Sequence, residues 1–537
     1  MTDRSTPRAL RMAQPLARDV MEEVAKQHGV CIRPIPLKRL DTYTGQTEII
    51  DVPCGATLDS KCPPCAKRNR QLRMAQCREG WHLDHEPIIT PHEPNDEQRW
   101  LIEFRADMQA QRDQAEQLGQ DTTDLDAIIT GLDAEINTAG MRGNVLGRAT
   151  PKRNRSTRRR QDAPDLPKRK MVNTTLGRTF TSSDGKVYRP SLFVTLTLPS
   201  YGKIKDGVPV DPDAYDYARA ARDALHFSKL ADRFVQNLRR VAGYDVQYFA
   251  TVEPQKRLAP HLHMAIRGTL PRADVKQIAA ATYHQVWWPS ADQVVFEADH
   301  LPVWENGVGY FNPDTGEVLP TWDEALDQLD ADPAAEPLHV VRFGVQVDVQ
   351  GVLGGTPDAD QCMRYLSKYL TKSLGEGLDA DDPAQREHTA RLLEALRFEP
   401  CSPTCANWLR YGVQPKDAKP GLVPGRCRGK AHKPDHLGHA GRRVLVSRKW
   451  SNKTLAEHKQ DRRTWVLEAL GQTDQPADPH RYVWKPIPAG DANVPPLAVR
   501  LLRTVAERQR WRAHMAQLQA QADGQDLSAT EHTGRAA

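Results

Sequence analysis

Two histidines separated by a single residue, His261 and His263, are the first side chains whose spacing could serve chemistry. They begin a segment, HLHMAIRG (261–268), that we expect to be a β-strand. Side chains two residues apart on a strand point to the same face, so the two imidazoles could bind one divalent cation. With 18 histidines in 537 residues, such a pair also arises readily by chance. Two exposed strand histidines without a ligand are therefore the alternative.

A glutamate extends this candidate site from the preceding strand. Glu253 ends a strand expected at 246–253, and a tight turn between antiparallel strands would bring its carboxylate beside His261 and His263. Two imidazoles and one carboxylate leave coordination positions open, which a metal ion needs in order to bind a substrate phosphate. Mixed nitrogen and oxygen ligands favour Mn²⁺, or Mg²⁺ that shares phosphate oxygens, over a closed structural zinc site.

Two tyrosines lie one helical turn apart further along the chain. Tyr365 and Tyr369 belong to a helix expected at 358–374, and Lys372 lies three residues beyond the second. At about 100° per residue, all three side chains fall on one face of that helix. A nearby ammonium favours the phenolate and neutralises charge on a phosphoryl transition state, so this face could attack a phosphodiester. An aromatic stripe buried in a core is the alternative.

Four cysteines near the start of the chain suggest a structural zinc site. They combine a C-x2-C pair with two further thiols at ribbon-like distances, and they are Cys54, Cys62, Cys65 and Cys77. His82 and His85 follow as substitute ligands. Zinc would stabilise a segment that is too polar to build its own core, whereas unligated thiols are the alternative.

A second cysteine set has looser spacing. It fits a second structural zinc site and unligated thiols equally well, and it consists of Cys401, Cys405 and Cys427, with His432 following. Cys362, on the tyrosine helix, is expected to be a packing residue, and Cys31 has no assigned role.

The composition excludes several classes of protein. No apolar run approaches the length of a membrane span, and the first twenty residues lack the apolar core of a secretory signal. Nine cysteines are too few for a disulfide scaffold in so long a chain. The net charge of +5 permits a nucleic-acid partner without requiring one. We therefore expect a soluble, cytoplasmic protein of several domains.

The elements that position these residues follow from the hydrophobic pattern. An antiparallel sheet covered by helices, an α+β fold, is expected because a short turn separates the two central strands. The expected strands are 191–198, 246–253, 261–268 and 340–350. The expected helices are 213–243, 272–286 and 358–374.

Three segments stand in an order that resembles the HUH endonucleases, in particular the rolling-circle replication initiators of actinobacterial plasmids and integrative elements. They are FVTLTLPSYG, VEPQKRLAPHLHMAIRG and RYLSKYLTKS. The resemblance covers most of residues 30–470, and it includes segments outside the motifs such as ATYHQVWWP and CANWLRYGVQPK. It implies an HUH domain with a central antiparallel sheet flanked by helices, a Cys-rich zinc-binding module and a helical C-terminal region.

The resemblance also implies an activity and roles for the residues above. The chain would nick DNA at a double-strand origin and transfer strands through a covalent 5′-phosphotyrosine. His261, His263 and Glu253 would hold the catalytic Mg²⁺ or Mn²⁺. Tyr369 is the first choice of nucleophile with Lys372 as its companion, and Tyr365 would serve as a second tyrosine.

The resemblance names partners and leaves two alternatives. The phosphate loop of a helicase is absent from the sequence, so a host helicase would unwind the duplex and a host polymerase would extend the nicked end. A transposase of the same superfamily shares the order of motifs. A non-catalytic, zinc-dependent DNA-binding regulator is the alternative from a different class.

Six segments are expected along the chain. They are a Cys-rich zinc-binding module (1–90), a helical segment (91–150), a basic linker (151–187), the HUH nickase domain (188–376), a Cys-containing and helical DNA-binding region (377–470), and a Pro-rich linker, helix and disordered tail (471–537). The region after 400 includes a candidate helix-turn-helix unit.

Overall fold

The structure is a computed structural model of the chain. It describes residues 15–81, 83, 85–87, 94–139, 141, 163, 165–185, 187–298, 300–354, 356–368, 370–375, 382–469, 481–488 and 490–533. Its contacts divide the chain into two compact units, of which one comprises residues 1–87 and 161–537 and the other residues 88–160. The expected linker at 151–187 lies outside the described residues over most of its basic part. Among the described helices, none is long and apolar enough to cross a membrane.

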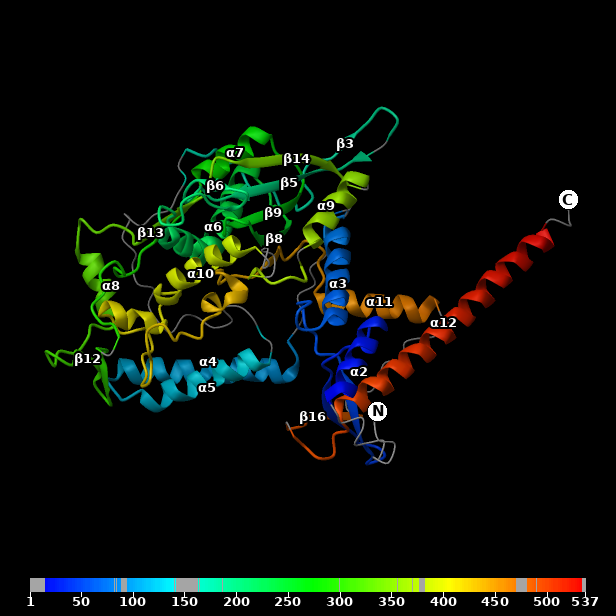
Figure 1. Ribbon diagram of the computed structural model, residues 1–537, viewed down its shortest axis with the longest axis horizontal. Coiled ribbons are helices and arrows are strands. Elements are labelled where there is room, and N and C mark those ends of the chain that lie inside the picture. Colours follow the sequence, from blue (N-terminus) through cyan, green and yellow to red (C-terminus); the bar gives the residue numbers. More distant parts are fainter. Residues whose placement is uncertain are drawn as a thin grey trace. The chain divides into compact units, whose positions relative to one another are not determined.

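A five-stranded antiparallel sheet forms the centre of the larger unit (Figure 1). Its strands, in spatial order, are β14 (Val347–Leu353), β5 (Pro190–Thr197), β9 (Pro260–Arg267), β8 (Tyr248–Pro254) and β15 (Val444–Val446). The fold is therefore mixed α and β with antiparallel sheets, as the hydrophobic pattern predicted. The edge strand β15 comes from outside the segment 188–376 that was expected to contain this sheet.

One face of the sheet packs against the long helix α6 (Tyr217–Ala242). Alternate residues of β5, such as Val194 and Leu196, are buried there with Phe234 of the helix. Asp216 caps the start of α6, and Gly243 ends it with a φ of 72°, a left-handed conformation that favours glycine. Helix α7 (Arg272–Ala281) packs beside α6.

The opposite face carries the polar residues of the site and a second apolar cluster. Helices α9 (Pro357–Lys368) and α3 (Pro63–Trp81) pack over it (Figure 1). Phe193 and Phe249 of the sheet are buried there together with Trp81 and Trp450. The N-terminal region thus contributes α3 directly to the apolar cluster on this face of the central sheet.

Three expected elements differ from the observed ones. The helix expected at 272–286 ends at Ala281, because Thr282 is extended and the aromatic and β-branched residues after it form β10 (Tyr283–Val286). The strand expected at 340–350 is split into β13 (His339–Arg342) and β14 around Gly344, where a Cβ would lie 3.0 Å from the backbone of Leu198. The tyrosine helix stops at Lys368 rather than continuing to 374.

The two ends of the chain form one module. Strands β1 (Ile35–Asp41), β2 (Thr47–Val52) and β16 (Tyr482–Pro486) make a three-stranded sheet, and α2 (Pro15–Gln27) packs against α12 (Leu497–Thr533). We call these five elements the terminal module. The expected division into an N-terminal segment (1–90) and a C-terminal segment (471–537) separates its two halves, and the expected disordered tail is wrong up to Thr533, where α12 ends.

The remaining elements are the smaller unit and the further helices and short strands of the larger unit. The smaller unit is a helical hairpin of α4 (Asp96–Gln117) and α5 (Thr123–Thr138). The expectation of a helix-turn-helix unit is wrong, because its first part forms β15 and only one helix, α11 (Leu455–Ala469), follows in the described residues of that segment. The others are β3 (Phe180–Thr181), β4 (Val187–Tyr188), β6 (Ile204–Lys205), β7 (Val208–Pro209), β11 (Val303–Glu305), β12 (Gly309–Phe311), α8 (Trp322–Ala331), α10 (Pro383–Phe398), η3 (Ala406–Tyr411), η4 (Lys430–His432) and η5 (Pro434–His436).

Candidate active site and metal centres

The register of the sheet gathers the predicted metal ligands on one face. His261 lies opposite Glu253 on β8, and the rings of His261 and His263 are 4.2 Å apart between centroids. His263 also lies opposite Thr195 on β5. Because paired residues of antiparallel strands share a face, the two imidazoles and the carboxylate point to the side that α9 covers.

Hydrogen bonding orients the His263 ring. Its Nδ1 lies 3.0 Å from the Thr195 hydroxyl, and its Nε2 lies 3.8 Å from the Glu253 carboxylate. When Nδ1 donates its proton to Thr195, the lone pair of Nε2 points toward Glu253, as metal ligation requires. Thr195 was not singled out in the sequence, although its place in FVTLTL, two residues from the strand end, is a signal that could have found it.

Burial keeps both imidazoles neutral. It lowers the pKa of His261 to about 4, with a further contribution from the positive charge of Arg257, and it lowers the pKa of His263 to about 3. Within the described residues, the buried His261 Nε2 has no hydrogen-bond partner. A neutral imidazole with an unsatisfied buried nitrogen fits a divalent cation, which would take up that lone pair.

Burial shifts the pKa of Glu253 upward, which also favours the neutral form. Burial raises the pKa of its carboxyl to about 7, although the charges of Arg443 and Lys368 oppose this shift. A cation bound between the carboxylate and the imidazoles would remove the cost of burying the negative charge. The donor set therefore suits a divalent ion with open coordination positions.

The tyrosine helix places one phenol over the histidines. The Tyr365 hydroxyl lies 3.3 Å from His263 Nε2, and the two rings meet edge to face with centroids 4.7 Å apart. Tyr365 is 43% exposed, so part of the residue faces solvent while its hydroxyl lies close to the candidate ligands. Tyr369 lies outside the described residues.

The expected common helical face of Tyr365 and Lys372 is wrong. Helix α9 ends at Lys368, so the exposed Lys372 lies beyond the helix, in a turn whose other residues are mostly buried. Backbone hydrogen bonds fix this turn from two sides. The Thr371 carbonyl accepts from the Asp59 N–H at 2.7 Å, and the Leu374 N–H donates to the Asp435 carbonyl at 3.0 Å.

The first cysteine group differs by one residue from the predicted set. The sulfur atoms of Cys31, Cys54, Cys62 and Cys65 all lie within 4.8 Å of one another. The assignment of Cys77 as a ligand is corrected, because α3 carries it about 18 Å along the helix axis from Cys65. Cys77 is instead buried against Trp81 and Trp450.

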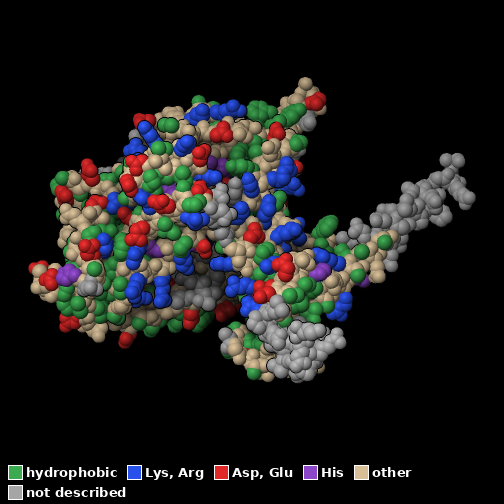
Figure 2. Space-filling view, viewed as in Figure 1, with side chains coloured by type: hydrophobic (Ala, Val, Ile, Leu, Met, Phe, Trp, Pro, Cys, Tyr) green, Lys and Arg blue, Asp and Glu red, His purple; other side chains and the backbone are tan. Residues whose placement is uncertain are grey.

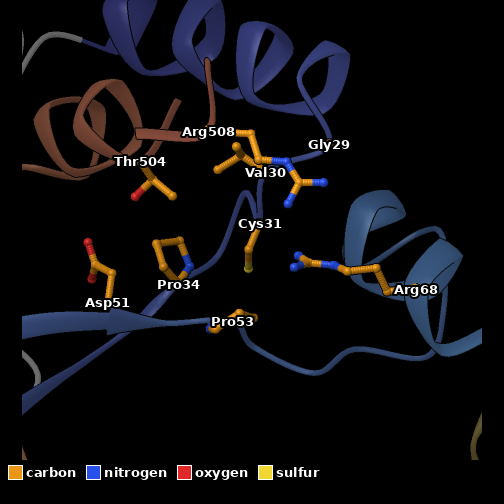
Figure 3. A pocket seen from close by; sticks show the side chains of 9 residues that line it. All are labelled: Gly29, Val30, Cys31, Pro34, Asp51, Pro53, Arg68, Thr504 and Arg508. Carbon is orange, nitrogen blue, oxygen red and sulfur yellow. The ribbon is translucent and has the colours of Figure 1, made fainter. Parts of the chain in front are cut away.

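A pocket beside this group is lined by residues from both ends of the chain (Figure 3). Cys31 lines the pocket together with Arg68 of α3 and Arg508 of α12, and both guanidinium groups point toward its interior. Arg68 Nη2 lies 3.6 Å from the Cys65 sulfur. Burial raises the pKa of the Cys65 and Cys31 thiols, so the charge of a bound metal ion would be needed to hold them as thiolates.

The second cysteine group includes the histidine that followed it in the sequence. Cys401, Cys405, Cys427 and His432 offer ligand atoms that all lie within 4.8 Å of one another. The His432 Nδ1 lies 3.0 Å from the Leu396 carbonyl, which directs Nε2 toward the thiols. Both groups can hold a metal ion, and four thiols or three thiols with one imidazole are donor sets of structural zinc.

The chain matches a known protein family. A family model described as RepSA, the replication initiator protein of pSAM2, matches residues 17–507. Neither the curated proteins nor the solved structures contain a match. The match covers most of the chain and confirms the resemblance to replication initiators of plasmids.

Proposed function

The chain belongs to the RepSA family of replication initiators, and from this premise we propose that it nicks one DNA strand at a plasmid double-strand origin to start rolling-circle replication. The observation that carries the chemistry is the convergence at His263. Its Nε2 faces both the Glu253 carboxylate and the Tyr365 hydroxyl, so a metal site and a nucleophile meet at one point. We propose that this part of the chain is an HUH nickase domain.

In the proposed reaction, a tyrosine attacks the phosphorus of one phosphodiester. The phenol loses its proton, the new bond joins the phenolic oxygen to phosphorus, and the bond from phosphorus to the 3′ oxygen breaks. The 3′ oxygen takes up a proton and leaves as a hydroxyl that primes a host polymerase, while a host helicase unwinds the duplex. A Mg²⁺ or Mn²⁺ ion held by His261, His263 and Glu253 would bind the scissile phosphate and spread its charge.

The position of Tyr365 supports it as a nucleophile. It carries the hydroxyl that lies beside His263, and the positive charge of Lys368 reaches Glu253 in the same site. Tyr369, the first choice from the sequence, would then be the second tyrosine of a two-step reaction, in which one cuts at initiation and the other at termination. Lys372 would assist Tyr369 with phosphate charge.

A covalent-product assay tests this proposal. The full chain is incubated with Mn²⁺ or Mg²⁺ and labelled oligonucleotides that tile the origin of its own plasmid, and the covalent peptide is mapped after proteolysis. Wild type should form the adduct, and Tyr365→Phe should abolish it at initiation. If only Tyr369→Phe abolishes it, the assignment of Tyr365 is wrong. If wild type forms no adduct with either metal, the chain is not a nickase, and a non-catalytic regulator becomes the better account.

We propose Zn²⁺ as the ion of both cysteine groups. Closed sets of four thiols, or three thiols and one imidazole, leave no position for a substrate, so their role would be structural. Metal analysis of the purified chain should find about two zinc ions, one for each group.

A further inference from the structure

A strongly basic segment borders the candidate active site without any role in the chemistry above. Residues 426–449, which we call the basic strap, contain eight Lys or Arg and one Asp. The strap has no Phe, Tyr or Trp, so it offers no aromatic platform on which bases could stack. Its chemistry is that of a row of cations.

The strap is fixed to the structure at three places. Cys427 and His432 belong to the second cysteine group. The carbonyl of Asp435 accepts from the N–H of Leu374, just after the tyrosine helix. Strand β15 then pairs with β8, and this pairing is extended by a 2.8 Å bond from the Val252 N–H to the Arg443 carbonyl. The strap therefore runs from a candidate metal centre past Val252, the residue beside Glu253, and then along β8.

The cations of the strap lie close enough for their charges to act on one another and on the candidate active site. The charge of Arg443 acts on Glu253 and on Lys430, and the charge of Arg442 acts on Arg73 of α3. Lys433 and Arg442 are exposed, and neither forms an ion pair in the described part of the chain. Figure 2 shows Lys and Arg side chains gathered over the surface where α3 and α9 lie in Figure 1. Cations held this close repel one another, and an anionic partner would remove that repulsion.

We propose that the basic strap binds the phosphate backbone of the single strand that leads to the nick site, and that the second cysteine group anchors it there. The inference rests on the proposed function, because it takes the nicked strand as the partner. A single strand fits because the strap passes the candidate site at Arg443, whose carbonyl accepts from the N–H of Val252, the residue beside Glu253, and the proposed reaction cuts one strand at that site. Without aromatic side chains, the strap contacts phosphates irrespective of sequence.

Salt-dependent binding tests the strap. The probe is a fluorescein-labelled oligothymidylate, and its anisotropy is measured without divalent metal across a range of NaCl concentrations. The test variant is Lys433→Gln with Arg442→Gln. The matched control is Lys416→Gln with Lys419→Gln, which removes two exposed charges from a segment outside the strap. Melting temperatures check that both variants stay folded.

The expected result is a change in the salt slope of the test variant alone. Each lost phosphate contact lowers the slope of log K against log salt by about 0.7 for single strands, so the test variant should lose about 1.4. The control should keep the wild-type slope. If the test variant keeps it too, or if both variants lose it equally, the strap is not the binding surface.

Two further variants separate this inference from the proposed function and from its anchor. In the Tyr365→Phe background the chain should bind the probe as wild type does, so a failure to nick leaves the strap result intact. Cys405→Ser should lose one equivalent of metal and show the same shallower slope as the test variant. If it loses the metal but keeps the slope, the strap binds DNA without the anchor, and that part of the inference is wrong.

Discussion

The candidate active site and the first cysteine group differ in how far apart in the chain their surrounding elements lie. One is built within a hairpin, and the other is closed by both ends of the chain. Glu253, His261 and His263 come from two adjacent strands joined by a short turn, and the register alone brings them together. The cysteine group instead combines Cys31 with three thiols that follow β2, and α12, from the other end of the chain, closes over it. The difference shows that a site built within one hairpin depends on local geometry, whereas the cysteine group depends on the tertiary packing of both chain ends.

Exchanging one cysteine tests the distant part of this comparison and has the largest expected effect. Cys31→Ser should lose one equivalent of zinc and open the terminal module, because structural zinc sites contribute roughly 10 kcal/mol or more to folding in small domains. Metal analysis and trypsin sensitivity near residues 481–512 measure both effects. Cys77→Ser is the control, because Cys77 packs in an apolar cluster and should leave the zinc content unchanged. Equal metal loss in the two variants would contradict the corrected ligand set.

Removing one imidazole tests the candidate active site, which is built within one hairpin. His263→Ala should lower the rate of covalent-adduct formation by about 10²–10³, since it removes a metal ligand and the group beside the Tyr365 hydroxyl. His300→Ala is the matched control, because His300 is exposed and pairs with Asp314 away from the sheet. An active His263→Ala variant would exclude this site as the metal centre.

A smaller change asks whether hydrogen bonding to the strand orients the ligand. Thr195→Val keeps the shape and the strand preference but removes the hydroxyl beside His263 Nδ1. Second partners of this kind typically contribute about 10- to 100-fold to metal affinity. Titration of the full chain with Mn²⁺ should show a loss in that range, with an unchanged melting temperature. No loss would mean that packing of the ring, rather than Thr195, sets its orientation.

The pH dependence should show the smallest effect. Because burial raises the pKa of Glu253 to about 7, the carboxyl is protonated below that pH in the metal-free chain, and Mn²⁺ affinity should fall by at most about tenfold per pH unit there. The free energy of unfolding of the metal-free chain should also fall as the pH rises from the ordinary pKa of a glutamate to about 7. Over that range the folded chain keeps a proton on Glu253 that the unfolded chain has already lost. Glu253→Gln should remove both dependences, and titrations at several pH values would measure this. His261 and His263 give the opposite pH trend. Because burial lowers their pKa values, they reduce the free energy of unfolding as the pH falls below the ordinary pKa of histidine.

Alternation along strands was enough to predict which of the strand residues share a face. It placed the imidazoles on one side of β9 and indicated the turn that brings Glu253 to them. It also predicted an antiparallel sheet covered by helices. These features depend on neighbours within about a dozen residues, where the periodicity of a strand is a reliable physical guide.

Three features could not be predicted from the sequence, because they depend on contacts distant in the chain or on where a helix ends. Spacing favoured Cys77, but the helix that begins at Pro63 carries it away from Cys65. Lys372 matched the helical period, but α9 ends at Lys368 and the following turn bonds to Asp59 and Asp435, which no local pattern announces. Strand β15 joins the sheet across about 190 residues, a pairing that periodicity cannot specify.

The pairing of β16 with β1 has a consequence for the order in which the molecule can be completed. Arg481 bonds to Asp41 across 440 residues, so the ribosome has made most of the chain before this sheet can close. Contacts of such long range form late, because the entropy of closing the loop opposes them. The residues around β5, β8, β9 and α9 are synthesised earlier and contain the whole His–Glu–Tyr arrangement. A chain that terminates before residue 481 would therefore carry the candidate active-site residues without a finished terminal module.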